Sequence, residues 1–365
     1  KIERLILKIG KYEIKHPIIQ GGMGVGISWD QLAGNVSLEG GLGVISSVGT
    51  GYYKNKSENV HIVTKKDKPK DVANFYSKDA LVEIIGNARK ICGDAPLGCN
   101  VLYAINDYGR VVRDACEAGF NMIITGAGLP TNMPEFTKDF PDVALIPIVS
   151  SARALKLICK KWKRYNKIPD AVIVEGPLSG GHQGFTYDQC GQEEFQLENI
   201  VGPVIEEAKM WGDIPIIAAG GVWDKKDIDK FIAMGCAGVQ MATRFIGTFE
   251  CDADAKFKNV LLNAKEEDIT LMKSPVGLPA RGVRTNLQFS IENNTAPKVQ
   301  CISNCVAPCN RGHEAKIVGY CIADRLGAAY NGDVDTGLFF TGSNGYRINK
   351  IISVKELMYK LTHGE

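Results

Sequence analysis

Eight short apolar segments, most of them ending in glycine or a small polar residue, constrain the fold of this chain more than any other feature. They cover residues 17–22, 41–47, 97–102, 122–126, 144–149, 171–176, 215–220 and 238–243. Continuous apolar runs of this length are typical of strands that are buried on both faces of a parallel sheet. The sequence therefore predicts a parallel sheet rather than an antiparallel sandwich.

Segments with helical spacing of apolar residues lie between these strands. They cover residues 28–40, 111–118, 152–163, 200–211 and 225–234, and residues 354–361 resemble a closing amphipathic helix. Eight strands alternating with helices are the number needed for a closed (β/α)8 barrel. The alternative is an open doubly wound sheet, which rarely needs eight consecutive parallel units. We therefore predict an α/β fold of the TIM-barrel type.

Two stretches interrupt the alternation. Residues 51–80 are polar and lysine-rich, and residues 249–331 are too long for a plain loop after the eighth strand. We expect residues 1–248 plus 332–365 to form the barrel, and residues 249–331 to form a cysteine-containing insertion or cap.

Composition excludes several classes of partner. The formal net charge is +2, so no basic excess would steer nucleic acid, and the densest basic run, at 65–70, is interpreted as a solvated loop. No apolar run approaches the ~20 residues that span a bilayer, and no signal sequence is evident. We expect a cytoplasmic protein that acts on a small molecule, without nucleic acid or membrane as partner.

The ends of the predicted strands are rich in glycine and polar residues. The first strand ends in Gln-Gly-Gly-Met-Gly at 20–24, the seventh in Ala-Ala-Gly-Gly at 218–221, and the eighth in Gln-Met-Ala-Thr-Arg at 240–244. Active sites of such barrels lie at the carboxyl ends of the strands, and a phosphate site is common after strands seven and eight. Because glycine lets backbone approach a flat ring or a phosphate closely, these ends predict a phosphate-bearing cofactor.

His182 is the strongest candidate for chemistry among the five histidines. It alone follows a predicted barrel strand closely and lies among glycines, in Ser-Gly-Gly-His-Gln-Gly at 179–184. A neutral imidazole there could abstract a proton or hydrogen-bond to an oxyanion. The alternative, a loop histidine bonded to backbone, is equally compatible with this pattern.

With these residues in view, the sequence resembles the nitronate monooxygenase (2-nitropropane dioxygenase) family and the related flavin-dependent enoyl-ACP reductases. The matching segments are 17–24 (PIIQGGMG), 40–43 (GGLG), 125–128 (TGAG), 175–184 (EGPLSGGHQG), 214–221 (IPIIAAGG), 238–244 (GVQMATR) and 332–335 (GDVD). They occur in order over nearly the whole chain. One departure is Pro177-Leu178-Ser179, where the family usually has a small or acidic triplet.

The resemblance implies a barrel that binds FMN non-covalently, with His182 as the catalytic histidine. It places Gly22 and Met23 beside the flavin ring, Asn100 at its polar edge, and Gln240 to Thr243 at its phosphate. The full set of implied cofactor-binding residues is Gly22, Met23, Gly24, Asn100, Thr125, Glu175, Gly181, Gln183, Gly184, Gly220, Gly221, Gln240, Met241, Ala242 and Thr243.

Three functions agree with this resemblance. The first is a nitronate monooxygenase that oxidises nitroalkanes or nitronates with O2. The second is an NAD(P)H-dependent flavin reductase acting on an enoyl thioester or a quinone. The third is a non-catalytic flavin-binding protein. The Gly-Gly-His-Gln-Gly segment at 180–184 does not separate them, because both enzyme groups share it.

Four of the eleven cysteines are concentrated in the predicted cap. Cys301, Cys305, Cys309 and Cys321 could hold an iron–sulfur cluster or zinc as thiolates. Their last two spacings are similar to the cluster-binding run of flavin-barrel dienoyl-CoA reductases. The alternative is a set of reduced thiols that pack within the cap, and both interpretations stay open on sequence alone.

Overall fold

The computed structural model describes residues 5–53, 75–296, 298–299 and 301–365. Its main feature is an eight-stranded sheet in which all neighbouring strands run parallel. The strands, in spatial order, are β3 (Ile18–Gln20), β11 (Gly238–Met241), β10 (Ile216–Ala219), β8 (Val172–Glu175), β7 (Ala144–Val149), β6 (Met122–Gly126), β5 (Leu97–Leu102) and β4 (Gly43–Ser46). A parallel bridge between Ile19 and Leu42 joins the two ends of the sheet. The predicted barrel is therefore confirmed, and each strand lies within a segment that the sequence marked.

Successive strand residues face opposite sides of the sheet, so the barrel has two apolar layers. Ile19, Ile124, Ile173 and Ile217 point inward and are fully or almost fully buried in the barrel interior. Their neighbours in sequence, such as Ile123, pack outward against the helices. This double burial explains why the strands are continuous apolar runs.

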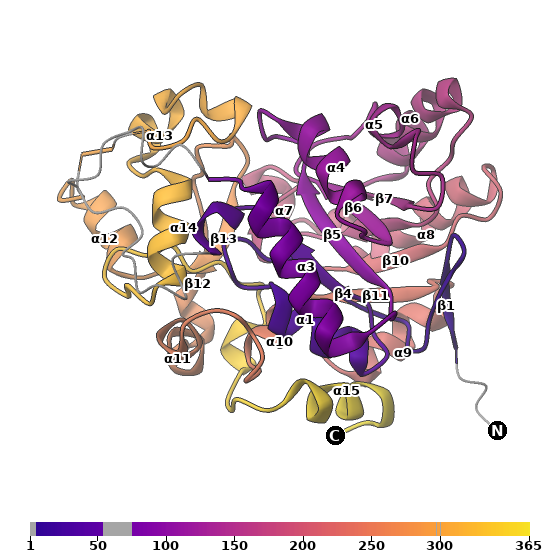
Figure 1. Ribbon diagram of the computed structural model, residues 1–365. Helices are drawn as coiled ribbons and strands as arrows, with labels where there is room; N and C mark the ends of the chain where they lie inside the picture. The colour runs from indigo at the N-terminus through magenta and orange to yellow at the C-terminus, as the bar shows by residue number, and fades with distance from the viewer. Residues whose placement is uncertain (1–4, 54–74, 297, 300) are drawn as a thin grey trace.

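Helices form the outer layer around these strands (Figure 1). They include α1 (Asp30–Leu38), α3 (Lys78–Cys92), α4 (Tyr108–Glu117), α5 (Met133–Thr137), α6 (Ala152–Trp162), α8 (Leu197–Lys209), α9 (Lys225–Ala233) and α15 (Val354–His363). The sequence did not predict α3, whose start lies inside the polar stretch 51–80. The basic run at 65–70 lies outside the described residues.

A short antiparallel hairpin closes the amino-terminal end of the barrel. It consists of β1 (Leu7–Ile9) and β2 (Tyr12–Ile14). Leu7, Ile9 and Ile14 are buried in the same cluster as the inward-facing barrel residues. This plug, which the sequence did not predict, leaves the carboxyl ends of the strands as the accessible end.

The chain between β11 and α15 builds a second group of elements on one side of the barrel (Figure 1). These are α10 (Thr243–Ile246), α11 (Ala255–Asn263), β12 (Ile269–Met272), β13 (Ala280–Val283), α12 (Asn286–Glu292), α13 (His313–Val318) and α14 (Ile322–Tyr330). We call residues 249–331 the cap, and its boundaries remain a prediction. None of the helices in the described ranges is both long and apolar enough to span a bilayer.

Candidate functional site

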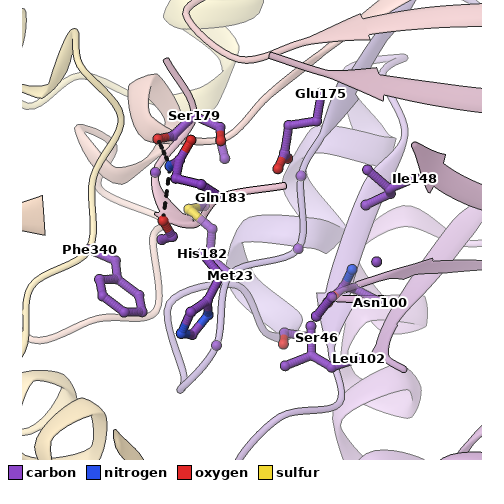
Figure 2. Close-up of a pocket in the computed structure, with 18 of the residues that line it drawn as sticks. Met23, Ser46, Asn100, Leu102, Ile148, Glu175, Ser179, His182, Gln183 and Phe340 are labelled. Carbon is purple, nitrogen blue, oxygen red and sulfur yellow. Dashed lines mark hydrogen bonds between the residues drawn. The ribbon is translucent and has the colours of Figure 1, made fainter. Parts of the chain in front are cut away.

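A cavity of about 650 Å3 lies where the carboxyl ends of the barrel strands meet the cap. All eight barrel strands or the residues directly after them contribute to its wall. The sequence-predicted residues that line it are Gly22, Met23, Gly24, Asn100, Glu175, Gly181, His182, Gln183, Gly184, Gly220, Gly221, Gln240, Met241, Ala242 and Thr243. Figure 2 shows Asn100, Glu175 and His182 around this space.

Thr125 is the predicted site residue that the cavity lining does not include. Its side chain is fully buried, and its hydroxyl lies 3.2 Å from the phenol oxygen of Tyr108 on α4. Ile124 faces the barrel interior, so the next residue along the strand faces the helices. Strand alternation therefore turns its side chain toward the helices, so the structure gives no support to the prediction for Thr125.

Two glycines bring backbone segments closer than any side chain would allow. A β-carbon on Gly22 would lie 2.4 Å from Cβ of Asn100, and one on Gly220 would lie 2.8 Å from the carbonyl oxygen of Gly176. Gly220 also has a φ of +98°, which favours glycine. Gly22 and Gly220 thus line the cavity without side chains, and we call this part of the wall the glycine floor.

His182 enters the cavity from β9 (Gly181–His182), a two-residue strand directly beyond β8. This strand pairs antiparallel with β13 of the cap, with Ala280 opposite His182. The imidazole Nε2 lies 2.7 Å from Oγ of Ser274, and its ring packs edge-on against Phe340 at a centroid distance of 5.4 Å. Burial lowers the pKa of His182 to about 4, so the imidazole is neutral near pH 7.

Glu175 is the acidic side chain at the end of β8, and it points into the same cavity (Figure 2). Burial raises its pKa to about 7. A carboxyl group with this pKa is partly protonated at neutral pH and can donate or accept a hydrogen bond. The cavity therefore holds two titratable groups whose pKa values are shifted in opposite directions.

Two buried polar atoms in the wall have no hydrogen-bond partner among the residues that the structure describes. They are Oγ of Ser179 and Oε1 of Gln183, whose own Nε2 donates to the carbonyl oxygens of Ser179 and Gly181. Both residues line the cavity. Because unpaired buried polar atoms are costly, a polar molecule bound there would stabilise this wall. The residues present therefore fit a cofactor that has a flat ring and a polar chain.

Several cavity residues were not predicted. The cap and the segment after it supply an apolar wall, formed by Val276, Leu278, Ile322, Ala323, Leu326, Leu338 and Phe340. A loop at 341–345 packs beside the eighth strand, and Nδ2 of Asn344 donates to the carbonyl oxygen of Gly221 at 2.9 Å. The turn-forming sequence Gly342-Ser343-Asn344 was the one signal that could have indicated this loop.

The four clustered cysteines line one small pocket in the cap. Nevertheless, no three His, Cys, Asp or Glu side chains in the described part of the chain are placed to hold a metal ion. Nothing supports an iron–sulfur cluster at Cys301, Cys305, Cys309 and Cys321, and zinc binding there stays a prediction.

Two of these thiols pack against apolar neighbours. Cys309 is buried in a small apolar cluster with Val306 and Ala315, and Cys305 packs against its edge. Burial raises the pKa of Cys305 to about 11, which keeps its thiol protonated near pH 7. These apolar contacts agree with the packing alternative.

Comparison with known proteins places this geometry in a family. The sequence model of the nitronate monooxygenase family matches residues 6–364. A probable nitronate monooxygenase of Staphylococcus saprophyticus is 27% identical over 289 residues, covering 75% of this chain and 77% of the relative. The (3aS,4S,5R,7aS)-5-hydroxy-7a-methyl-1-oxo-octahydro-1H-indene-4-carboxyl-CoA dehydrogenase of Rhodococcus jostii is 28% identical over 77% of this chain, which spans 66% of that relative's length.

Solved structures agree with this placement. FabK from Thermotoga maritima superimposes with a TM-score of 0.70 and 26% identity, over 96% of this chain and 93% of FabK. Nitroalkane oxidase from Streptomyces ansochromogenes has the same fold, with a TM-score of 0.66 and 20% identity over 95% and 94% of the two chains. On the match over residues 6–364, this chain belongs to the nitronate monooxygenase family of flavin-dependent oxidoreductases.

Proposed function

We propose that this chain binds FMN in the 650 Å3 cavity and oxidises nitroalkanes or nitronates with O2. The flat glycine floor at Gly22 would face the flavin ring, with Asn100 at its polar edge. Ser179 and Gln183 would hydrogen-bond to its polar chain, and the strand end from Gln240 to Thr243 would hold its phosphate. Bound FMN would supply the redox chemistry by accepting electrons from the substrate.

His182 carries the protein's part of the reaction. The neutral imidazole would remove the proton from the carbon next to the nitro group, forming a nitronate and an imidazolium. Among the described residues no hydrogen bond uses its Nδ1, and this nitrogen is the one left for a substrate. The single observation that carries the proposal is this imidazole in the cavity wall, where Nε2 lies 2.7 Å from Oγ of Ser274.

The apolar wall favours a second candidate, the NAD(P)H-dependent reduction of an enoyl thioester. Val276, Leu278, Ile322 and Leu326 extend the cavity well beyond what a small nitroalkane needs. A long acyl chain would bury these side chains and gain hydrophobic free energy. The similarity to FabK, an enoyl-ACP reductase, agrees with this candidate.

Anaerobic bleaching of the flavin absorbance separates the two functions. The FMN-loaded protein would be mixed with a nitroalkane, its nitronate, NADH or NADPH in parallel. Rapid bleaching by the nitro compounds, with reoxidation by O2, supports the first proposal. Bleaching by NADH or NADPH alone, followed by reoxidation with an enoyl thioester, would replace it with the second.

A further inference from the structure

Phe340 lies beside His182 on the cavity side of the cap sheet, which is the name we give to the strands β12, β13 and β9. On β13, Ala280 is opposite His182 and Gly282 is opposite Phe340. Directly opposed residues share one face of a sheet, as do residues two apart on a strand, so both rings project to the same face. The rings meet edge-on, with centroids 5.4 Å apart. In the view of Figure 2, Phe340 lies next to the imidazole, on the side away from Asn100.

Apolar side chains of the cap and of the segment after it surround Phe340. Its ring packs against the buried cluster that contains Ile322 and Leu338, and Val276 and Leu326 lie at the edge of the same cluster. All five residues line the cavity. The cap side of the cavity is therefore a hydrocarbon surface that begins beside the imidazole.

This surface offers nothing to a charged group. None of the described cap residues that line the cavity has a charged side chain, and Glu175, at the end of β8, is the only carboxylic acid in the described lining. Burying a charge without a partner is costly, whereas burying apolar surface is favourable. The part of a substrate that meets the cap should therefore be a neutral hydrocarbon group.

We infer that Phe340 is a specificity-determining residue that limits the groups attached to the reacting carbon. The inference rests on the proposed role of His182, because the carbon that loses its proton to the imidazole must lie close to it and hence next to Phe340. A single unbranched chain can pass the phenyl ring and continue along the cap, whereas a second substituent on the same carbon would meet the ring. The preferred substrates are neutral primary nitroalkanes with an unbranched chain.

Phe340→Ala tests the inference with two isomeric substrates, 1-nitrobutane and 2-nitrobutane. In FMN-loaded protein, the parent should have the higher kcat/KM with 1-nitrobutane. Phe340→Ala should raise the ratio of kcat/KM for 2-nitrobutane to that for 1-nitrobutane about tenfold, because one carbon in a hydrophobic pocket changes kcat/KM by roughly 10-fold to 200-fold. If Phe340 only supports the packing around His182, both substrates slow by the same factor and the ratio does not change. That result, or a parent without preference for 1-nitrobutane, would overturn the inference.

Phe289→Ala is the matched control. Phe289 is also a phenylalanine of the cap, but it is 46% exposed on α12, and the guanidinium of Arg284 lies over its ring. It does not belong to the cavity lining, so the ratio should equal that of the parent. Phe340→Leu keeps an apolar side chain against the cluster and should give an intermediate ratio. Far-ultraviolet circular dichroism checks folding, and Phe340→Leu decides the question if Phe340→Ala does not fold.

Binding of unreactive analogues separates this inference from the proposed reaction. Pentanamide and 2-methylbutanamide have the carbon skeletons of the two substrates, with a neutral planar amide in place of the nitro group. Their dissociation constants follow from the change in flavin absorbance. The parent should bind pentanamide more tightly, and Phe340→Ala should reduce this preference about tenfold. A parent that shows this preference but does not oxidise nitroalkanes would reject the reaction and support the role of Phe340. Equal affinities for the two amides in the parent, or no binding of either, would overturn the role.

Discussion

The backbone N–H of Gly342 donates to Oγ1 of Thr243 at 2.8 Å, although 99 positions separate the two residues. Thr243 begins α10, two residues after the eighth barrel strand β11, and Gly342 belongs to the loop at 341–345. Both line the cavity on the side where we place the FMN phosphate. This hydrogen bond therefore holds the loop at 341–345 against the proposed cofactor site.

Thr243→Val should weaken FMN binding while the fold is kept. Valine has nearly the shape of threonine but leaves the Gly342 N–H without its acceptor, which frees the loop. We expect the dissociation constant for FMN to rise roughly tenfold, as for the loss of one well-placed hydrogen bond. Fluorescence titration of the apoprotein with FMN measures it. Thr362→Val, which removes a hydroxyl bonded to Met358 on α15, is the control and should bind FMN normally.

His182→Ala should abolish most turnover of neutral nitroalkanes. General-base catalysis typically contributes roughly 10²–10⁴-fold, whereas a preformed nitronate needs no proton abstraction. FMN content should be nearly unchanged. Equal losses with both substrates, or release of the flavin, would show a structural histidine instead.

The pH profile of the parent enzyme gives a second test of His182. A base is active when deprotonated, and the pKa of His182 is lowered to about 4. The rate with neutral nitroalkane should therefore hold steady as the pH falls from 7 to 5, and should drop only near pH 4. A fall in rate centred near pH 6.5 would mean that the histidine is solvated in the working enzyme.

Glu175→Gln should change how stability depends on pH. The folded pKa of Glu175 is about 7, above the 4.5 of an unperturbed glutamate, so the folded state binds this proton more tightly. The resulting contribution of Glu175 to the free energy of unfolding is fully present below about pH 4.5 and is lost as the pH rises to about 7. Thermal melts of the apoprotein across this range should show a smaller decline in Tm for Glu175→Gln than for the parent. If the Tm of both proteins declines equally with pH, the pKa of Glu175 is not raised in the folded state.

Gly22→Ala should interfere with the flavin site. Its β-carbon would lie 2.4 Å from Cβ of Asn100, so Asn100 or the loop must move. We expect FMN affinity to fall at least about tenfold, since small displacements at a built site are costly. Gly86→Ala is the control, because nothing lies within 4 Å of a β-carbon there and alanine favours helix α3. If Gly22→Ala retains its full flavin content, the flavin ring does not lie beside Gly22.

The sequence predicted the barrel well because buried parallel strands have a distinctive composition. Ile123 and Ile124 both had to be apolar, since one faces the helices and the other the interior. The hairpin at 7–14 gave no such signal, because its strands are three residues long and only partly buried. Helix α3 escaped notice because its first turn continues a polar, lysine-rich stretch.

Prediction of the site succeeded where residues adjoin a strand and failed where tertiary packing supplies them. Strand ends meet at one end of any parallel barrel, which places Asn100 and His182 together. Ser274 and Val276 come from the cap, whose folding over the barrel no local pattern indicates. The sequence alone did not show that the Thr125 side chain faces the helices, because a strand presents only alternate side chains to the cavity.

The pairing of β9 with β13 makes His182 part of a cap sheet as well as of the barrel end. If the cap opens locally on heating, the rate of proton abstraction by His182 should fall at a temperature well below that of global unfolding. On heating, turnover of neutral nitroalkane should decline first, nitronate oxidation later, and flavin release last. The activity with neutral nitroalkane would then measure the thermal stability of the cap sheet separately from that of the whole protein.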